Sequence, residues 1–132
     1  MIALPPQIRV YLYRRPTDMR KSFNGLVALT ESAMQQDPLS GSLFVFVNRR
    51  RDRVKILYCG ESGFCIWYQQ VQQGTYQLPD PESLDGEETL EVTRAQLSLI
   101  LDGIDLSSAR QRPRFQLERE RRHSHTGTPA AP

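Results

Sequence analysis

Apolar and polar side chains alternate near the start of the chain, which predicts a β-strand. Ile8, Val10 and Leu12 are apolar, and the residues between them are Arg9 and Tyr11. A period of two places the three apolar side chains on one face of an extended strand. Sequence pattern thus places the first strand over about residues 8–13.

The next segment has the spacing of an amphipathic helix over about residues 19–36. Thr17 or Asp18 is expected to cap its start, and Pro38 closes it. Gly25 weakens the first turns by about 1 kcal/mol relative to alanine. The apolar positions at helical spacing are Phe23, Leu26, Val27, Thr30, Ala33 and Met34.

Three short apolar runs in the middle of the chain predict a β-meander. They are Leu43–Val47, Val54–Cys59 and Phe64–Tyr68. The connections Asn48–Arg53 and Gly60–Gly63 have hairpin lengths, so the strands are expected to be antiparallel neighbours. Strands this apolar must be shielded from water on their faces, and the first helix is the expected element to pack on them.

A second helix is marked by local signals at both ends. Thr93 and Gln96 form a capping box, and Gly103 fits the left-handed position after the helix. Residues 69–88 predict a loop around Tyr76, and Leu90–Val92 predicts a short strand just before the helix.

These elements predict an α+β fold in the order strand, helix, three-stranded meander, helix. The sheet is expected to be mostly antiparallel, with about four to five strands and a helix packed on one face. Residues 1–106 form the predicted single domain. Residues 107–132 are rich in Arg, Pro and Ser and predict a disordered tail.

Composition narrows the class of protein. No run approaches the length of a membrane span, and the first residues do not form a signal peptide, so a cytoplasmic protein without membrane contact is expected. Cys59 and Cys65 are interpreted as reduced, structural residues, and no metal or other cofactor is expected. No histidine lies before His123, and no phosphate-binding glycine loop occurs, so the chain is not expected to be an enzyme.

Charge is divided along the chain. Residues 1–60 carry net +6, residues 61–108 net −8 and residues 109–132 net +4. Such segregation bears on partners rather than on fold. The densest basic segment is the predicted turn at 48–53. The candidate nucleic-acid-binding residues, on this turn and on the strand–helix junction, are Arg49, Arg50, Arg51, Arg53, Lys55, Arg14, Arg15, Arg20 and Lys21.

Each of these features also has a structural interpretation. The arginine turn can be a solvated tip that prevents edge-to-edge aggregation. The tail arginines can be a nucleic-acid-binding arm or a solubilising segment. Four aromatic residues can stack on bases or simply pack in the core: Tyr11, Tyr13, Trp67 and Tyr68.

Several stretches together resemble a known family. They are Arg20–Leu26, the run Leu43–Tyr58, Gly63-Phe64 with Trp67-Tyr68, and Leu101–Asp105. The chain is similar over about residues 8–106 to the Orf2-like accessory proteins of bacterial insertion sequences of the sixty-six type, sometimes labelled TnpB. It departs from them at Cys59-Gly60, where an aromatic and an acidic residue are expected.

The resemblance implies a non-catalytic accessory role in transposition beside a separate transposase. Two hypotheses follow for the molecular task. In the first, the basic hairpin binds element DNA. In the second, the hairpin or an acidic loop docks on the transposase or on another protein of the element, which suits the opposite charges of residues 1–60 and 61–108. The acidic residues of that loop are Asp80, Glu82, Asp85, Glu87, Glu88 and Glu91. The sequence leaves the oligomeric state open.

Overall fold

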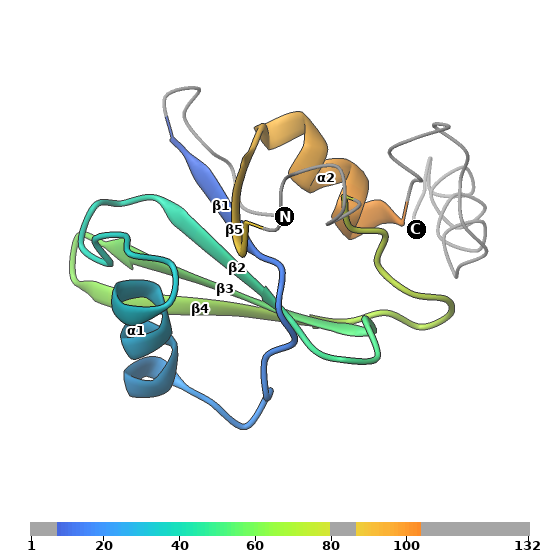
Figure 1. The fold of residues 1–132 in the computed structure, drawn as a ribbon, viewed down its shortest axis with the longest axis horizontal. Helices are drawn as coiled ribbons and strands as arrows, with labels where there is room; N and C mark the ends of the chain where they lie inside the picture. The colour runs from blue at the N-terminus through green and yellow to red at the C-terminus, as the bar shows by residue number, and fades with distance from the viewer. Residues whose placement is uncertain (1–7, 80–86, 104–132) are drawn as a thin grey trace, which may run out of the picture.

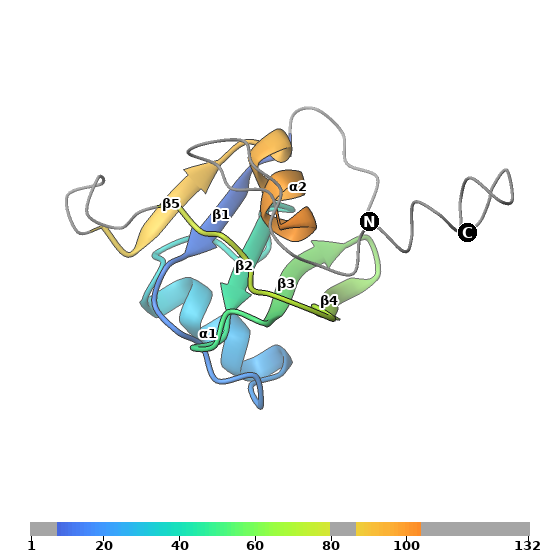
Figure 2. The same ribbon diagram turned by 90° about the vertical axis from the view of Figure 1, so that its right-hand side faces the viewer.

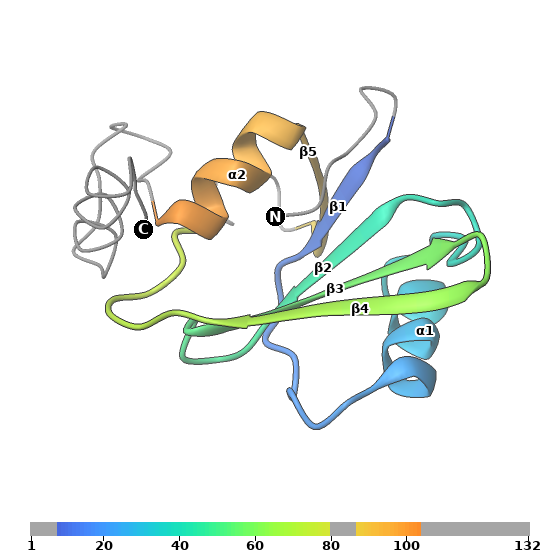
Figure 3. The ribbon, with the colours of Figure 1, turned by 180° about the vertical axis from the view of Figure 1, so that it is seen from behind.

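Within residues 8–79 and 87–103, which this computed structural model describes, the chain forms a five-stranded sheet with one helix on each face (Figures 1 and 3). The expected α+β fold is confirmed. The elements in chain order are β1 (Val10–Tyr13), α1 (Phe23–Ser32), β2 (Leu43–Val47), β3 (Arg53–Gly60), β4 (Gly63–Gln70), β5 (Thr89–Val92) and α2 (Arg94–Asp102).

The strand order across the sheet is β4-β3-β2-β1-β5. The meander β2-β3-β4 is antiparallel as predicted, with Val47 opposite Val54 and Gly60 opposite Gly63. β1 lies on the other side of β2 and runs parallel to it, with Val10 opposite Leu43. A parallel pair needs a crossover connection, and α1 lies in that crossover. β5 pairs antiparallel with β1 and forms the far edge.

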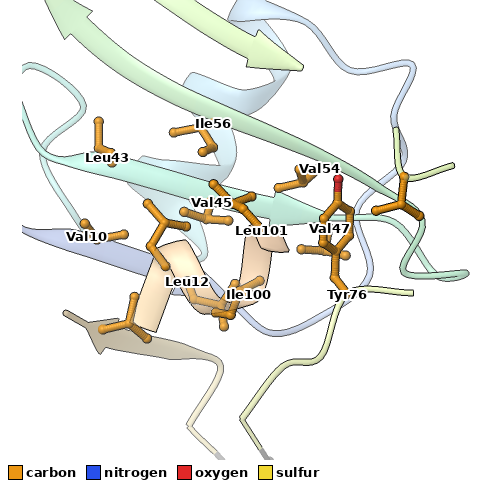
Figure 4. Close-up of a cluster of buried hydrophobic side chains, with 13 residues drawn as sticks. Val10, Leu12, Leu43, Val45, Val47, Val54, Ile56, Tyr76, Ile100 and Leu101 are labelled. Atoms are coloured by element: carbon orange, nitrogen blue, oxygen red, sulfur yellow. The ribbon is translucent and has the colours of Figure 1, made fainter. Parts of the chain in front are cut away.

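One face of the sheet packs against α2 (Figure 4). The buried side chains on this face include Val45 and Ile56 from the sheet, Ile100 and Leu101 from α2, and Tyr76 from the loop after β4. Tyr76 has no exposed surface and is among the largest buried side chains. The expectation of a helix on one face is therefore incomplete, because α2 covers the second face.

The opposite face packs against α1, as the sequence predicted. Phe44, Phe46 and Leu57 from the sheet lie in one buried cluster with Leu26 and Met34. Strand β2 alternates between the two clusters, so all five of its residues are buried. Its continuous apolar run thus reflects a central strand covered on both sides.

Helix α1 is shorter than its periodicity predicted, at both ends. Ser22 is the N-cap and makes no side-chain cap bond, so the expected capping by Thr17 or Asp18 is wrong. Asp18 instead accepts a hydrogen bond from the N–H of Arg20 at 2.9 Å, which makes a turn before the helix. At the other end, Gln35 takes a positive φ of 56°, which ends the helical path.

Helix α2 follows its sequence signals. The Thr93 side chain accepts from the N–H of Gln96, and the Gln96 side chain accepts from the N–H of Thr93. Gly103 has φ 76°, the left-handed conformation predicted for it. No helix in the described part of the chain is long and apolar enough to cross a membrane. The predicted tail at 107–132 lies outside the described residues, and the domain division stays a prediction.

Candidate nucleic-acid interface

The turn between β2 and β3 is organised by the side chain of Asn48. Its Oδ1 accepts from the N–H groups of Asp52 and Arg53, both at 3.0 Å, and its Nδ2 donates to the Asp52 carboxylate at 2.7 Å. The N–H of Arg51 donates to the Asn48 carbonyl at 3.0 Å and closes the turn. Arg51 has φ 60°, a conformation that costs a non-glycine residue about 1–2 kcal/mol. The hydrogen bonds hold the turn in spite of that cost.

The loop after β4 supports the same turn from the side. Val71 donates its N–H to the Asp52 carbonyl at 2.9 Å, and Tyr76 donates its N–H to the Arg51 carbonyl at 2.7 Å. The buried Tyr76 hydroxyl donates to Gln69 Oε1 at 2.8 Å. Figure 4 shows Tyr76 beside Val47, at the end of β2 from which the turn leaves. The turn is therefore fixed to the α2-side core.

The four arginines of this turn lie on its outside. Arg49, Arg50, Arg51 and Arg53 are exposed. None of them forms an ion pair with any residue in 8–79 or 87–103. We call these four residues the basic tip. It presents guanidinium groups on a fixed backbone, and no carboxylate within residues 8–79 or 87–103 forms an ion pair with them.

A hollow of about 510 Å³ adjoins the basic tip. Its other wall is the segment before α1, which is held in place by a hydrogen bond of 2.9 Å from Thr17 N–H to the Val47 carbonyl. Two carboxylates share the hollow with the arginines. The lining residues are Pro16, Thr17, Asp18, Met19, Asn48, Arg49, Arg50, Asp52 and Arg53.

Lys55 does not lie on this surface. It is 8% exposed, and its Nζ donates to the carbonyls of Met19 at 2.8 Å and Lys21 at 2.7 Å. The same Nζ lies 4.7 Å from the centre of the Tyr68 ring. Lys55 therefore fixes the segment before α1 to the sheet, and its ammonium is turned away from any ligand of the basic tip.

The junction residues are less available than the basic tip. Arg20 forms an ion pair of 2.7 Å with Asp18, and Arg15 one of 3.0 Å with Glu88. Arg14 is half-buried, and its N–H donates to the Glu88 carbonyl at 2.8 Å. Lys21 is exposed. Parallel pairing of β1 and β2 puts the junction and the basic tip at one end of the sheet, but Arg14 and Arg15 meet Glu88 beside β5.

Three of the four aromatic candidates for base stacking are occupied by packing. The Tyr11 and Phe44 ring centres lie 5.9 Å apart, and Tyr13 is buried against Phe46. Trp67 packs against the α2-side core. Tyr68 is 49% exposed, but the Lys55 ammonium lies over its ring in a cation–π contact.

Sequence reasoning missed the residues that hold the basic tip in place. The sequence pattern marks Asn48 only as the start of the connection at 48–53, although an asparagine side chain in a turn often bonds to the backbone nearby. The sequence predicts a loop around Tyr76, and a single aromatic residue in a polar segment is the available signal for an anchor. Nothing local distinguishes Lys55 from a surface lysine.

The described residues limit the chemistry of this surface. They contain no group of three or more His, Cys, Asp or Glu side chains able to hold a metal ion. Cys59 and Cys65 are free thiols. The geometry defines a small α+β protein with a rigid, positively charged turn.

Comparison with known proteins gives the family. The model of the IS66 Orf2 like protein family matches residues 8–111, so the chain belongs to that family. It is a family of accessory proteins associated with transposition, and the predicted membership is confirmed.

Two relatives come from Sinorhizobium fredii. The chain is 32% identical to the uncharacterized protein y4jC over 113 residues, which are 86% of this chain and 93% of the relative. It is 30% identical to the uncharacterized protein y4hO over 105 residues, which are 80% and 88% of the two chains. No solved structure matches the chain significantly.

The role of Asn48 is testable by Asn48→Ala. The substitution removes three hydrogen bonds inside the turn and should lower the free energy of unfolding by about 2 kcal/mol. Chemical denaturation measures the change. Asn24→Ala, on the exposed side of α1, is the matched control and should change stability little. Equal stability of the two variants would show that the turn does not depend on Asn48.

The Asp18–Arg20 pair predicts a pH effect. Hydrogen bonds from the side chain and then the backbone of Arg20 lower the pKa of Asp18 from 3.8 to about 2. A lowered folded-state pKa means that the pair stabilises the fold above pH 4 and loses this effect as the pH falls toward 2. A carboxyl ¹³C NMR titration should show the low pKa, and Arg20→Ala should return it toward 3.8. An unchanged pKa in that variant would exclude Arg20 as the cause.

Proposed function

We propose that this protein supports transposition by binding nucleic acid, most directly the DNA of its element, through the basic tip. The observation that carries the proposal is the set of four exposed arginines without an ion pair in the described part of the chain. Their mutual repulsion is relieved when an anion binds. A phosphate backbone supplies a row of such anions.

Arginine suits this task because its planar guanidinium makes two parallel hydrogen bonds to a phosphate. The adjoining hollow gives the backbone of a nucleic acid room beside Arg49, Arg50 and Arg53. The carboxylates of Asp18 and Asp52 in the same hollow are already bonded, to Arg20 and Asn48. Arg20 offsets the charge of Asp18, whereas the neutral amide of Asn48 leaves the charge of Asp52 in place. The three arginines that line the hollow still outnumber its two carboxylates.

The fixed backbone of the turn favours binding as well. Asn48 and the loop at 71–76 order the turn before any ligand arrives, so only the arginine side chains lose freedom on binding. Contacts of this kind position a protein on a duplex and carry no sequence information. The proposed task is attachment to element DNA, with selection of the element's ends left to another protein such as the transposase.

Reversing three charges of the basic tip tests this function. The triple variant Arg49→Glu, Arg50→Glu, Arg51→Glu should abolish binding of element-end DNA, because phosphates would meet carboxylates. If about four phosphates are neutralised by the native protein, log K should fall with log salt at a slope of about −3.6. Fluorescence anisotropy at several salt concentrations measures both effects.

Arg94→Glu is the control, since Arg94 follows β5 at the end of the sheet opposite to the basic tip. A single reversal there should leave affinity nearly unchanged, whereas Arg50→Glu alone should weaken binding. An affinity for element-end DNA that does not change with salt concentration or with the triple reversal would contradict the proposal.

A second candidate is docking on the transposase, favoured by the acidic side chains at the β5 edge. Glu87, Glu88 and Glu91 are exposed there, at the opposite edge of the sheet from β4. If this edge binds the transposase, the two proteins should co-purify from lysate treated with nuclease. Loss of the complex after nuclease treatment would mean that DNA alone joins them.

A further inference from the structure

Strand β4 forms one edge of the sheet (Figure 2). A two-residue turn joins Gly60 to Gly63, so this pair and every second pair after it exchange hydrogen bonds with β3. The N–H and C=O groups of Phe64, Ile66 and Tyr68 therefore point away from β3. Within residues 8–79 and 87–103 no other backbone group bonds to them.

Strand β4 also lacks the features that protect exposed edges. It spans eight residues, Gly63–Gln70, and contains neither a charged residue nor proline. The other edge, β5, is four residues long and carries Glu91, which is ion-paired with Arg9 at 3.9 Å. The chain thus protects one edge of its sheet and leaves the longer edge open.

We propose that two copies of this chain pair antiparallel through the open edges of β4 to form one continuous sheet. Charge at the ends of the strand selects this occupant and this direction. Exposed Glu61 precedes β4, and Arg53 lies opposite its last residue, Gln70. Antiparallel pairing brings Glu61 of each copy toward Arg53 of the other and leaves Arg49, Arg50 and Arg51 of the basic tip for the DNA contact, whereas parallel pairing would place like charges together. Strand β4 itself contains no charged residue that could attract a different, charged partner.

The pleat of the strand restricts how the copies align. The outward groups belong to alternate residues, so a two-fold axis passes through either Ile66 or Trp67. In both registers, opposed side chains of the two copies lie on the same face of the continuous sheet, so each apolar face extends from one copy to the other. The symmetry closes the assembly as a dimer, because the two remaining edges are the short, charged β5 strands.

The dimer has a consequence that rests on the function proposed above. Arg51 lies about five or six residues along the strand from the axis, so the two basic tips would be roughly 35–45 Å apart. Because the axis is perpendicular to the sheet, the two tips lie at opposite ends of the dimer, and any face of the sheet toward which one tip inclines is shared by the other. One turn of DNA measures about 34–36 Å, so both tips can contact one duplex about a turn apart.

Sedimentation equilibrium of the full chain tests the pairing. The native protein should show twice the 15.2 kDa of one chain. Tyr68→Pro removes an outward N–H and should halve the mass, because the proline ring also blocks the approaching strand. Tyr68→Ala is the matched control: it loses the same ring and its contact with Lys55 but keeps the N–H, so it should remain dimeric.

Hydrogen exchange on the native protein gives a measurement that needs no variant. The amides of Phe64, Ile66 and Tyr68 should be protected at high concentration and lose protection on dilution. A monomer with rapidly exchanging amides, or equal association of the two Tyr68 variants, would overturn the dimer.

The dimer and the DNA contact can fail separately. The triple glutamate variant of the basic tip should remain dimeric, while Tyr68→Pro should bind DNA about 100-fold more weakly than Tyr68→Ala through loss of the second contact. A dimer that binds no DNA would refute only the function of the tip. DNA binding by a monomer would refute only the pairing of β4.

Discussion

Burial of the central strand on both faces is the constraint on which the rest of this structure depends. All five residues of β2 are buried, and its side chains alternate between the α1 and α2 clusters. A strand of this kind requires a neighbour on each side and a helix on each face. β1 and β3 supply the neighbours, and the chain leaves the end of β2 through the polar segment at 48–53. The basic tip is therefore anchored directly to the most buried part of the protein.

A few polar contacts convert that anchored turn into a defined surface. Asn48 bonds the turn from inside, and the backbone of the 71–76 loop bonds it from the side. Lys55 fixes the opposite wall of the hollow, because its buried ammonium donates hydrogen bonds to the carbonyls of Met19 and Lys21. A buried cation is costly unless its donors are satisfied, and here two carbonyls and the Tyr68 ring surround it. Its charge serves the fold, while the charges of the basic tip remain outside.

Local sequence patterns predicted the elements whose structure depends on interactions between residues close together in the chain. The three meander strands and α2 were placed from periodicity, hairpin lengths and the Thr93–Gln96 capping box, because each involves residues close together in sequence. The start of α1 was misplaced because Lys55, more than thirty residues away, binds the carbonyls before it. The same contact keeps Lys55 away from the basic surface that the sequence predicts for it. The parallel placement of β1 likewise depends on pairing that no local signal encodes.

The distribution of ion pairs separates the basic tip from three other surface arginines. Arg9, Arg15 and Arg20 each have a carboxylate partner within 4 Å, even though all three lie at the surface. The four tip arginines have none in the described part of the chain, and Arg51 adopts a left-handed backbone conformation as well. Asp18 and Asp52 line the same hollow, yet their carboxylates are bonded to Arg20 and Asn48. A solubilising turn requires neither the backbone strain nor the hydrogen bonds that offset it, because flexible exposed charges serve that purpose equally well. Strain and unneutralised charge held together on a fixed backbone are typical of a binding site, where the ligand supplies the missing counter-charge.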